Sequence, residues 1–240
     1  MIVIASHNNI ECLARILKSL SKADTNGHRI CVVDTNSTSD AYRDFVDHLK
    51  DQYPSIIFLR SNYDCYDSGA YLLAYRSFDD DTFIFLQDSV TISNKSFIPD
   101  VDTLLKEYDV VPFINFPFYF EGKEQKRWGE QGVIPWHLKW LPLNTHKQGF
   151  VINKYPKEAF FGPMFGVTKS ALDKIPARWH VEPTTKVQAC AMERRWALLF
   201  HYTGASIQVY EYVPHDRWND FWNMHPDFRQ NIQKAWMSRD

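Results

Sequence analysis

Residues 2–9 read Ile-Val-Ile-Ala-Ser-His-Asn-Asn, a short apolar run that changes abruptly to polar side chains. Three more apolar runs of four residues follow at 30–33, 56–59 and 83–86. Each is rich in β-branched or aromatic residues, which is typical of buried strands in a parallel sheet. We therefore predict four buried strands in this part of the chain.

Helical patterns separate these strands. Residues 10–20, 39–50 and 68–78 each repeat apolar side chains every three or four positions, which places them on one face of a helix. In the first segment this face consists of Leu13, Ile16, Leu17 and Leu20. Strands and helices that alternate in this way predict right-handed crossovers, and therefore an α/β fold with a mostly parallel central sheet flanked by helices.

The residues that follow each strand are unusually polar. Positions 6–9, 34–40, 60–64 and 87–89 are rich in Ser, Asn and Asp. These residue types also cap helices, so one such cluster alone indicates little. Ligands of open α/β sheets bind outside the carboxyl ends of the strands, and four polar clusters at one edge therefore predict a ligand site there.

Length and charge bound the class of protein. The chain has 240 residues, of which 45% are hydrophobic, and this excludes a disordered chain. Lys and Arg number 27 against 29 Asp and Glu, so the net charge of −2 gives no overall attraction to nucleic acid or anionic membranes. We find no repeat or linker in the sequence and expect one domain over residues 1–240, with no nucleic-acid partner.

The cysteines and the amino-terminal residues bear on the compartment. Cys12, Cys31, Cys65 and Cys190 are too far apart for a CxxC pair, and we expect free thiols in a reducing compartment. The first residues lack the basic segment of a signal peptide, and no apolar run approaches the ~20 residues of a membrane-spanning helix. We expect a cytoplasmic protein without an integral membrane segment.

Beyond residue 109 the pattern changes. Residues 112–157 hold prolines and aromatic residues with little periodicity, and we interpret them as a lid-like excursion with short strands. Regular patterns then predict a strand at 159–167, helices at 169–175 and 185–201, a strand at 206–213 and a helix at 227–237.

Taken in order, residues 2–8, 32–40, 67–74 and 83–89 resemble nucleotide-sugar glycosyltransferases of the glycosyltransferase-A fold, of the family-2 type. The second half continues the resemblance. Residues 161–175 are similar to the acceptor-side strand and helix, and residues 192–204 to the helix that carries the acidic pair of inverting members. The resemblance implies a single domain with a nucleotide-sugar-binding half at 1–108 and an acceptor-binding half at 109–240.

The resemblance also implies roles for residues of the first half. Ser6 and His7 match the loop against which the base and ribose of the donor lie, and Asp34 matches the acid that binds the base. Asp67 matches a polar position that helps to hold the nucleotide, and Asp88 matches an aspartate of the Asp-x-Asp signature that ligates a divalent metal. A carboxylate suits these tasks, because it accepts from base N–H groups and binds hard cations.

The metal and the catalytic base are implied in the same way. Mn²⁺ or Mg²⁺ would neutralise the departing diphosphate, although residues 87–89, Gln-Asp-Ser, carry one carboxylate where two are common. His215 matches a further metal ligand of some relatives. Glu193 matches the general base that takes the proton of the acceptor hydroxyl, with Glu182 as the alternative.

The expected activity is therefore transfer of a sugar from a uridine or guanosine diphosphate sugar to a hydroxyl of a glycan or another acceptor, with inversion and metal assistance. Two alternatives remain open. A nucleotidyltransferase normally needs a Gly-rich basic loop after the first strand, and residues 6–9 contain neither Gly nor Lys. A nucleotide-sugar or glycan binding module without catalysis would be consistent with the missing second carboxylate.

Overall fold

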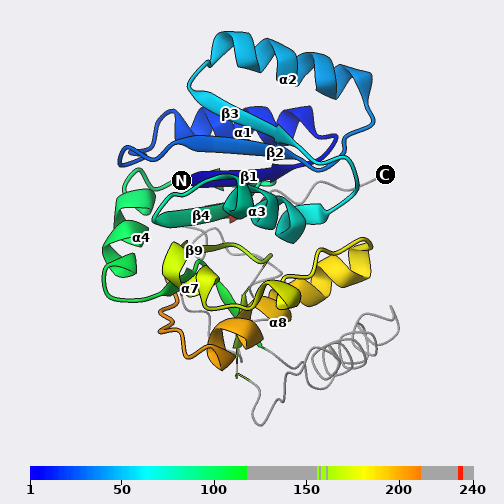
Figure 1. Ribbon diagram of the computed structural model, residues 1–240. Helices are drawn as coiled ribbons and strands as arrows, with labels where there is room; N and C mark the ends of the chain where they lie inside the picture. Colours follow the sequence, from blue (N-terminus) through cyan, green and yellow to red (C-terminus); the bar gives the residue numbers. More distant parts are fainter. Residues whose placement is uncertain (118–155, 157, 161, 212–231, 235–240) are drawn as a thin grey trace.

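Six strands form the central sheet of the computed structural model, in the order β3-β2-β1-β4-β9-β6 (Figure 1). They are β1 (Ile2–Ser6), β2 (Ile30–Asp34), β3 (Ile56–Arg60), β4 (Thr82–Gln87), β6 (Val110–Pro112) and β9 (Phe165–Thr168). β1 pairs in parallel with β2 and β4, and β2 with β3, whereas β9 runs antiparallel to β4 and β6. The four strands predicted in the first half and the mostly parallel sheet are confirmed, although β3 lies at the sheet edge and is only half-buried.

The structure describes residues 1–117, 156, 158–160, 162–211 and 232–234. Two small antiparallel sheets accompany the central one within these ranges. One pairs β5 (Val90–Ile92) with β10 (Ile232–Lys234), and the other pairs β7 (Asn115–Pro117) with β8 (Glu158–Phe160). None of the helices described in these ranges is long and apolar enough to cross a membrane. All four cysteines lie in the described ranges and none of them forms a disulfide.

Five of the predicted helices are present in the described residues, and the segments at 97–105 and 177–179 are helical without such a prediction. The helices are α1 (Ile10–Leu20), α2 (Asp40–Gln52), α3 (Tyr66–Ser77), α4 (Phe97–Leu105), α7 (Lys169–Asp173), the short 3-10 helix η1 (Ala177–Trp179) and α8 (Lys186–Tyr202). The side chains of Asn9 and Ser39 cap α1 and α2 by accepting backbone N–H groups. α3 packs against β1, β2 and α8 (Figure 1).

A buried aromatic cluster joins the two halves of the chain. Tyr71 of α3 stacks on Phe85 of β4, with ring centroids 4.5 Å apart, and Phe85 meets Phe165 of β9 edge to face at 5.2 Å. Trp196 of α8 lies 5.4 Å from Phe165, and its indole N–H donates to the hydroxyl of Ser68 at 3.0 Å. These contacts hold α8 against α3 and β9.

Three predicted elements of the second half differ from the structure. The strand expected at 159–167 is two strands, β8 and β9, because Gly162 adopts a positive φ of 60° and turns the chain between them. Residues 206–211 form no strand and contact their neighbours through isolated bridges, such as that between Val110 and Ile207. The helix expected at 227–237 contains β10 instead. Most of the lid-like excursion lies outside the described residues.

Candidate functional site

The loops after β1, β2 and β4 meet at the carboxyl edge of the sheet. Ser6, the last residue of β1, donates its hydroxyl to a carboxylate oxygen of Asp88 at 2.8 Å. The same oxygen lies 3.4 Å from the backbone N–H of His7. Tyr42 of α2 donates its hydroxyl to Ser6 Oγ at 2.7 Å, and burial raises the pKa of Tyr42, which keeps this donor protonated. A chain of hydrogen bonds thus holds the Asp88 carboxylate.

Asp34 ends β2 with a buried carboxylate. One oxygen, Oδ1, accepts the backbone N–H of Ser37 at 2.8 Å and so closes the turn that precedes α2. The other, Oδ2, lies 3.6 Å from the guanidinium Nε of Arg60, the last residue of β3. Arg60 also donates to the Ser37 carbonyl at 2.8 Å. Asp34 therefore fixes its own loop and carries a negative charge at the edge of the sheet.

His7 is exposed beside this loop. Its Nδ1 lies 2.9 Å from the carbonyl of Thr35, which can only accept, so Nδ1 carries the proton. Its Nε2 then accepts from the side-chain amide of Asn8 at 3.1 Å. Asn8 has a φ of 51°, and its amide oxygen accepts the backbone N–H groups of Thr38 and Ser39, both at 3.0 Å. The loops after β1 and β2 are therefore tied together.

Asp67 lies in the first turn of α3. One carboxylate oxygen accepts its neighbour Ser68 N–H at 2.7 Å, and the other accepts the side-chain amide of Gln87. Gln87 directly precedes Asp88, in the segment that carries one carboxylate where two are common in the family pattern. A carboxylate at position 87 would face Asp67 with like charge, whereas the amide donates to it. The residue types at positions 67 and 87 thus complement each other.

Glu193 projects from α8 and is half-buried. Its Oε1 accepts the backbone N–H of Gly162 at 2.9 Å, which fixes the orientation of the carboxylate. Burial, together with the negative charges of Glu193 and Asp67, raises the pKa of the Cys190 thiol to about 11. α8 packs against α3, the helix that carries Asp67 in its first turn.

The arginines that follow Glu193 are structural. Arg194 and Arg195 are buried, and Arg195 donates to the Trp179 carbonyl at 2.9 Å. Burial lowers the pKa of Arg195 to about 10. The alternative base, Glu182, contacts the hydroxyl of Tyr63 and forms an ion pair with Arg76. These contacts favour a structural role for Glu182.

The donor set for a divalent metal is small. In the part of the chain that the structure describes, no three His, Cys, Asp or Glu side chains gather as a metal site. His215 lies outside the described residues. Asp88 alone fits an ion that the diphosphate and water hold for the most part, since Mg²⁺ keeps several waters. The described residues therefore fit a metal ion that binds together with the donor diphosphate. They fit less well an ion that the protein holds without the donor.

Sequence reasoning missed the residues that organise this edge. Tyr42 lies on the apolar face of its helix, so the sequence pattern predicts a core residue and gives no sign that its hydroxyl contacts Ser6. Arg60 ends the edge strand and carries no local signal of its ion pair with Asp34. The asparagines at positions 8 and 36, both in the left-handed region, are local signals in these loops, because Asn tolerates that conformation.

Comparison with known protein families gives one match. The model of glycosyl transferase family 2 matches residues 1–176. The chain belongs to glycosyl transferase family 2. This confirms the resemblance of the sequence and favours a glycosyltransferase over a nucleotidyltransferase. No curated protein matches the chain significantly.

Solved structures share the fold of this family 2 chain at low identity. A mannosyltransferase from Pyrobaculum calidifontis, in complex with GDP-Man and Mn²⁺, is 11% identical with a TM-score of 0.53, over 90% of this chain and 54% of its own. GalNAc-T7 with UDP, GalNAc and Mn²⁺ is 11% identical with a TM-score of 0.57, over 87% and 41%. S. aureus TarS 1-349 in complex with UDP-GlcNAc is 15% identical with a TM-score of 0.53, over 87% and 54%. The family 2 chain thus spans about half the length of these structures or less.

Proposed function

We propose that this family 2 chain binds a nucleoside diphosphate sugar at the carboxyl edge of its sheet and transfers the sugar to a hydroxyl acceptor with inversion. The observation that carries the proposal is the convergence of Ser6, Asp34, Asp67 and Asp88 on one edge, linked through hydrogen bonds from neighbouring loops. The GDP-Man, UDP and UDP-GlcNAc complexes of structures with the same fold support a donor of this class.

The first half of the chain, 1–108, would hold the donor. Asp34 carries the charge that accepts N–H groups of the base, and His7 stands exposed beside it for contact with the base or ribose. Asp67 and Gln87 form the next polar pair along the edge. Asp88 would hold Mn²⁺ or Mg²⁺ with the diphosphate oxygens, and His215 is proposed as a further ligand. The ion would stabilise the charge of the departing diphosphate.

The second half of the chain, 109–240, would bind the acceptor. Glu193 receives the proton as the acceptor oxygen forms its bond to the anomeric carbon and the bond from that carbon to the diphosphate breaks. The Gly162 N–H held by Oε1 keeps the carboxylate in place, so that little reorganisation is needed. Attack on the face opposite the diphosphate inverts the anomeric configuration.

A thermal-shift panel tests donor binding. We expect UDP or GDP with Mn²⁺ to raise the melting temperature, because a ligand at 100 times its Kd stabilises by about 2.7 kcal/mol. ADP with Mn²⁺ serves as the base control, and the metal alone as the ion control. If no nucleoside diphosphate shifts the transition, the donor site proposed at this edge is wrong.

A binding module without catalysis is the second candidate. Two observations favour it: residues 87–89 carry a single carboxylate, and Arg194 directly follows Glu193. Hydrolysis of the nucleotide sugar with Mn²⁺ and no acceptor separates the two. Slow release of UDP or GDP supports the enzyme, whereas binding without any release supports the module.

A further inference from the structure

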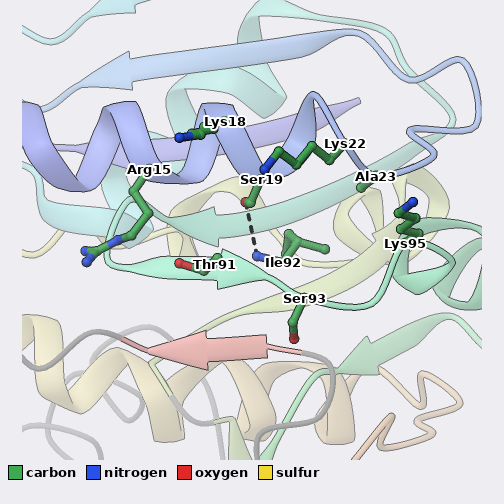
Figure 2. A pocket seen from close by; sticks show the side chains of 9 residues that line it. All are labelled: Arg15, Lys18, Ser19, Lys22, Ala23, Thr91, Ile92, Ser93 and Lys95. Carbon is green, nitrogen blue, oxygen red and sulfur yellow. Dashed lines mark hydrogen bonds between the residues drawn. The ribbon is translucent and has the colours of Figure 1, made fainter.

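A pocket of about 270 Å³ lies between α1 and β5 (Figure 2). Its described lining consists of Arg15, Lys18, Ser19, Lys22, Ala23, Thr91, Ile92, Ser93 and Lys95. We call it the α1–β5 pocket. None of the residues proposed for the donor contributes to this lining, so a ligand here would be additional to the nucleotide sugar.

Backbone and side-chain hydrogen bonds build the pocket from both sides. Ser19 of α1 accepts the backbone N–H of Ile92 of β5 at 3.1 Å and donates to the Ile16 carbonyl at 2.8 Å (Figure 2). The backbone N–H of Asp24 donates to the carbonyl of Lys95 at 3.0 Å, which joins the end of α1 to the loop after β5. The two walls are therefore held together before any ligand arrives.

The charge of the described lining has one sign. Four of its side chains are cationic, Arg15, Lys18, Lys22 and Lys95, and none is acidic. Among the described residues no carboxylate forms an ion pair with any of these four. The buried Nε of Arg15 has no hydrogen-bond partner there either, while its Nη2 donates to Cys12 Sγ at 3.0 Å. Four uncompensated cations with hydroxyls of Ser and Thr between them suit an anion.

The helix dipole explains only part of this arrangement. Cations near the carboxyl end of a helix are favourable, which accounts for Lys18 in the last turn of α1 and for Lys22 just beyond it, each taken singly. Both also line one pocket, where like charges repel. Lys95 comes from a different segment and Arg15 from the middle of α1. Convergence of cations from two elements points to a ligand that neutralises them.

We propose that the α1–β5 pocket binds a phosphate group, carried by a soluble phosphate ester or diphosphate or by a lipid headgroup. The guanidinium of Arg15 offers forked N–H donors that match phosphate oxygens, and the lysines supply point charges around it. The apolar side chains of Ala23 and Ile92 also line the pocket, and they could contact the uncharged part of such a ligand.

Titration of inorganic pyrophosphate into the full chain, in buffer without divalent metal, tests the proposal. The test variant is Lys18→Gln/Lys22→Gln. The matched control is Lys50→Gln/Lys106→Gln, which removes the same charge from two exposed lysines outside the pocket. We expect the test variant to weaken Kd about tenfold or more, because a hydrogen bond to a charged group is worth at least that factor, and the control to leave it nearly unchanged. Backbone amide shifts should map to residues 15–23 and 91–95.

Two further arms identify the source of the phosphate. Vesicles of neutral lipid with and without phosphatidic acid test a headgroup, and UDP or GDP with Mn²⁺ tests independence from the donor site. Binding of pyrophosphate or of phosphatidic acid vesicles that the test variant loses and the control keeps supports the proposal, and donor affinity should be equal in both variants. Absence of both kinds of binding, or equal weakening in test and control variants, would overturn it.

Discussion

Ser6 and Asp88 join the ends of β1 and β4 through a hydrogen bond of 2.8 Å from the serine hydroxyl to the carboxylate. The two residues are 82 positions apart in sequence, and the parallel pairing of their strands brings them together. Tyr42 completes the chain by donating to Ser6 at 2.7 Å. The carboxylate proposed to meet the metal is thus oriented by the sheet and by α2 before a donor binds.

Replacement of Tyr42 tests whether this chain of hydrogen bonds matters. In Tyr42→Phe the buried Ser6 hydroxyl loses its donor, and we expect a loss of about 1 kcal/mol in the free energy of unfolding. Urea unfolding measures this loss. Tyr53→Phe is the control, since the ring of Tyr53 is exposed. Equal stability of the two variants would contradict a structural role for the Tyr42 hydroxyl.

Asp88→Asn should reduce turnover and metal dependence together. The amide keeps the size of the side chain and can still accept from Ser6, but it loses the negative charge that holds a divalent cation. Initial rates at increasing Mn²⁺ measure both effects. Asp51→Asn, which removes an exposed carboxylate from α2, is the control for charge. Full wild-type activity in the presence of a chelator would remove the metal from the account.

Glu193→Gln should lower turnover by 10²–10⁴ while donor affinity stays nearly constant. Loss of a general base costs about 3–5 kcal/mol in the barrier, and the base does not hold the nucleotide. The glutamine oxygen can still accept from Gly162, which protects the local structure. Glu107→Gln, an exposed glutamate after α4, is the matched control. Unchanged turnover in Glu193→Gln would redirect the search for the base to Glu182.

The carboxyl group of Glu211 makes the stability of the protein depend on pH. Burial raises the pKa of this carboxyl to about 7, above the ordinary value of 4.5. The folded state therefore binds more protons than the unfolded state between these values, and stability falls as the pH rises from 4.5 through 7. Compared with Glu211→Gln, the wild type should lose on the order of 1 kcal/mol between pH 5 and pH 8, because partial exposure reduces the full linkage effect. Unfolding curves of both proteins at the two pH values decide this, and a constant difference would contradict it.

The first half of the fold could be predicted because local sequence and final structure agree there. Ile10–Leu20 begins and ends as its apolar spacing indicates, and β1, β2 and β4 are the buried runs that the sequence predicts, whereas the edge strand β3 is half-buried. The second half could not be predicted in the same way. The apolar stretch around Gly162 reads as one strand, and only the pairing of β9 between β4 and β6 reveals the turn.

The candidate site was predictable in its residue types and not in its contacts. Asp34 and Asp88 follow directly from the position of strand ends in an α/β sheet. Their partners Arg60 and Tyr42 come from an edge strand and a helix face, and only the assembled sheet brings them within reach. Gln87 shows no local sign of its contact, and only the folded chain brings its amide to the Asp67 carboxylate.

The account rests on the donor site at the carboxyl edge, and Asp34 tests it most directly. Asp34→Ala would remove the acceptor that closes the turn at Ser37, so Asp34→Asn, which keeps that acceptor, is the better variant. The measurement is calorimetric titration of UDP and GDP, each with Mn²⁺, into the wild type and Asp34→Asn. The account predicts that the wild type binds at least one nucleotide and that the variant binds it about tenfold or more weakly. Equal affinity of the two proteins, or no binding by the wild type, would contradict it.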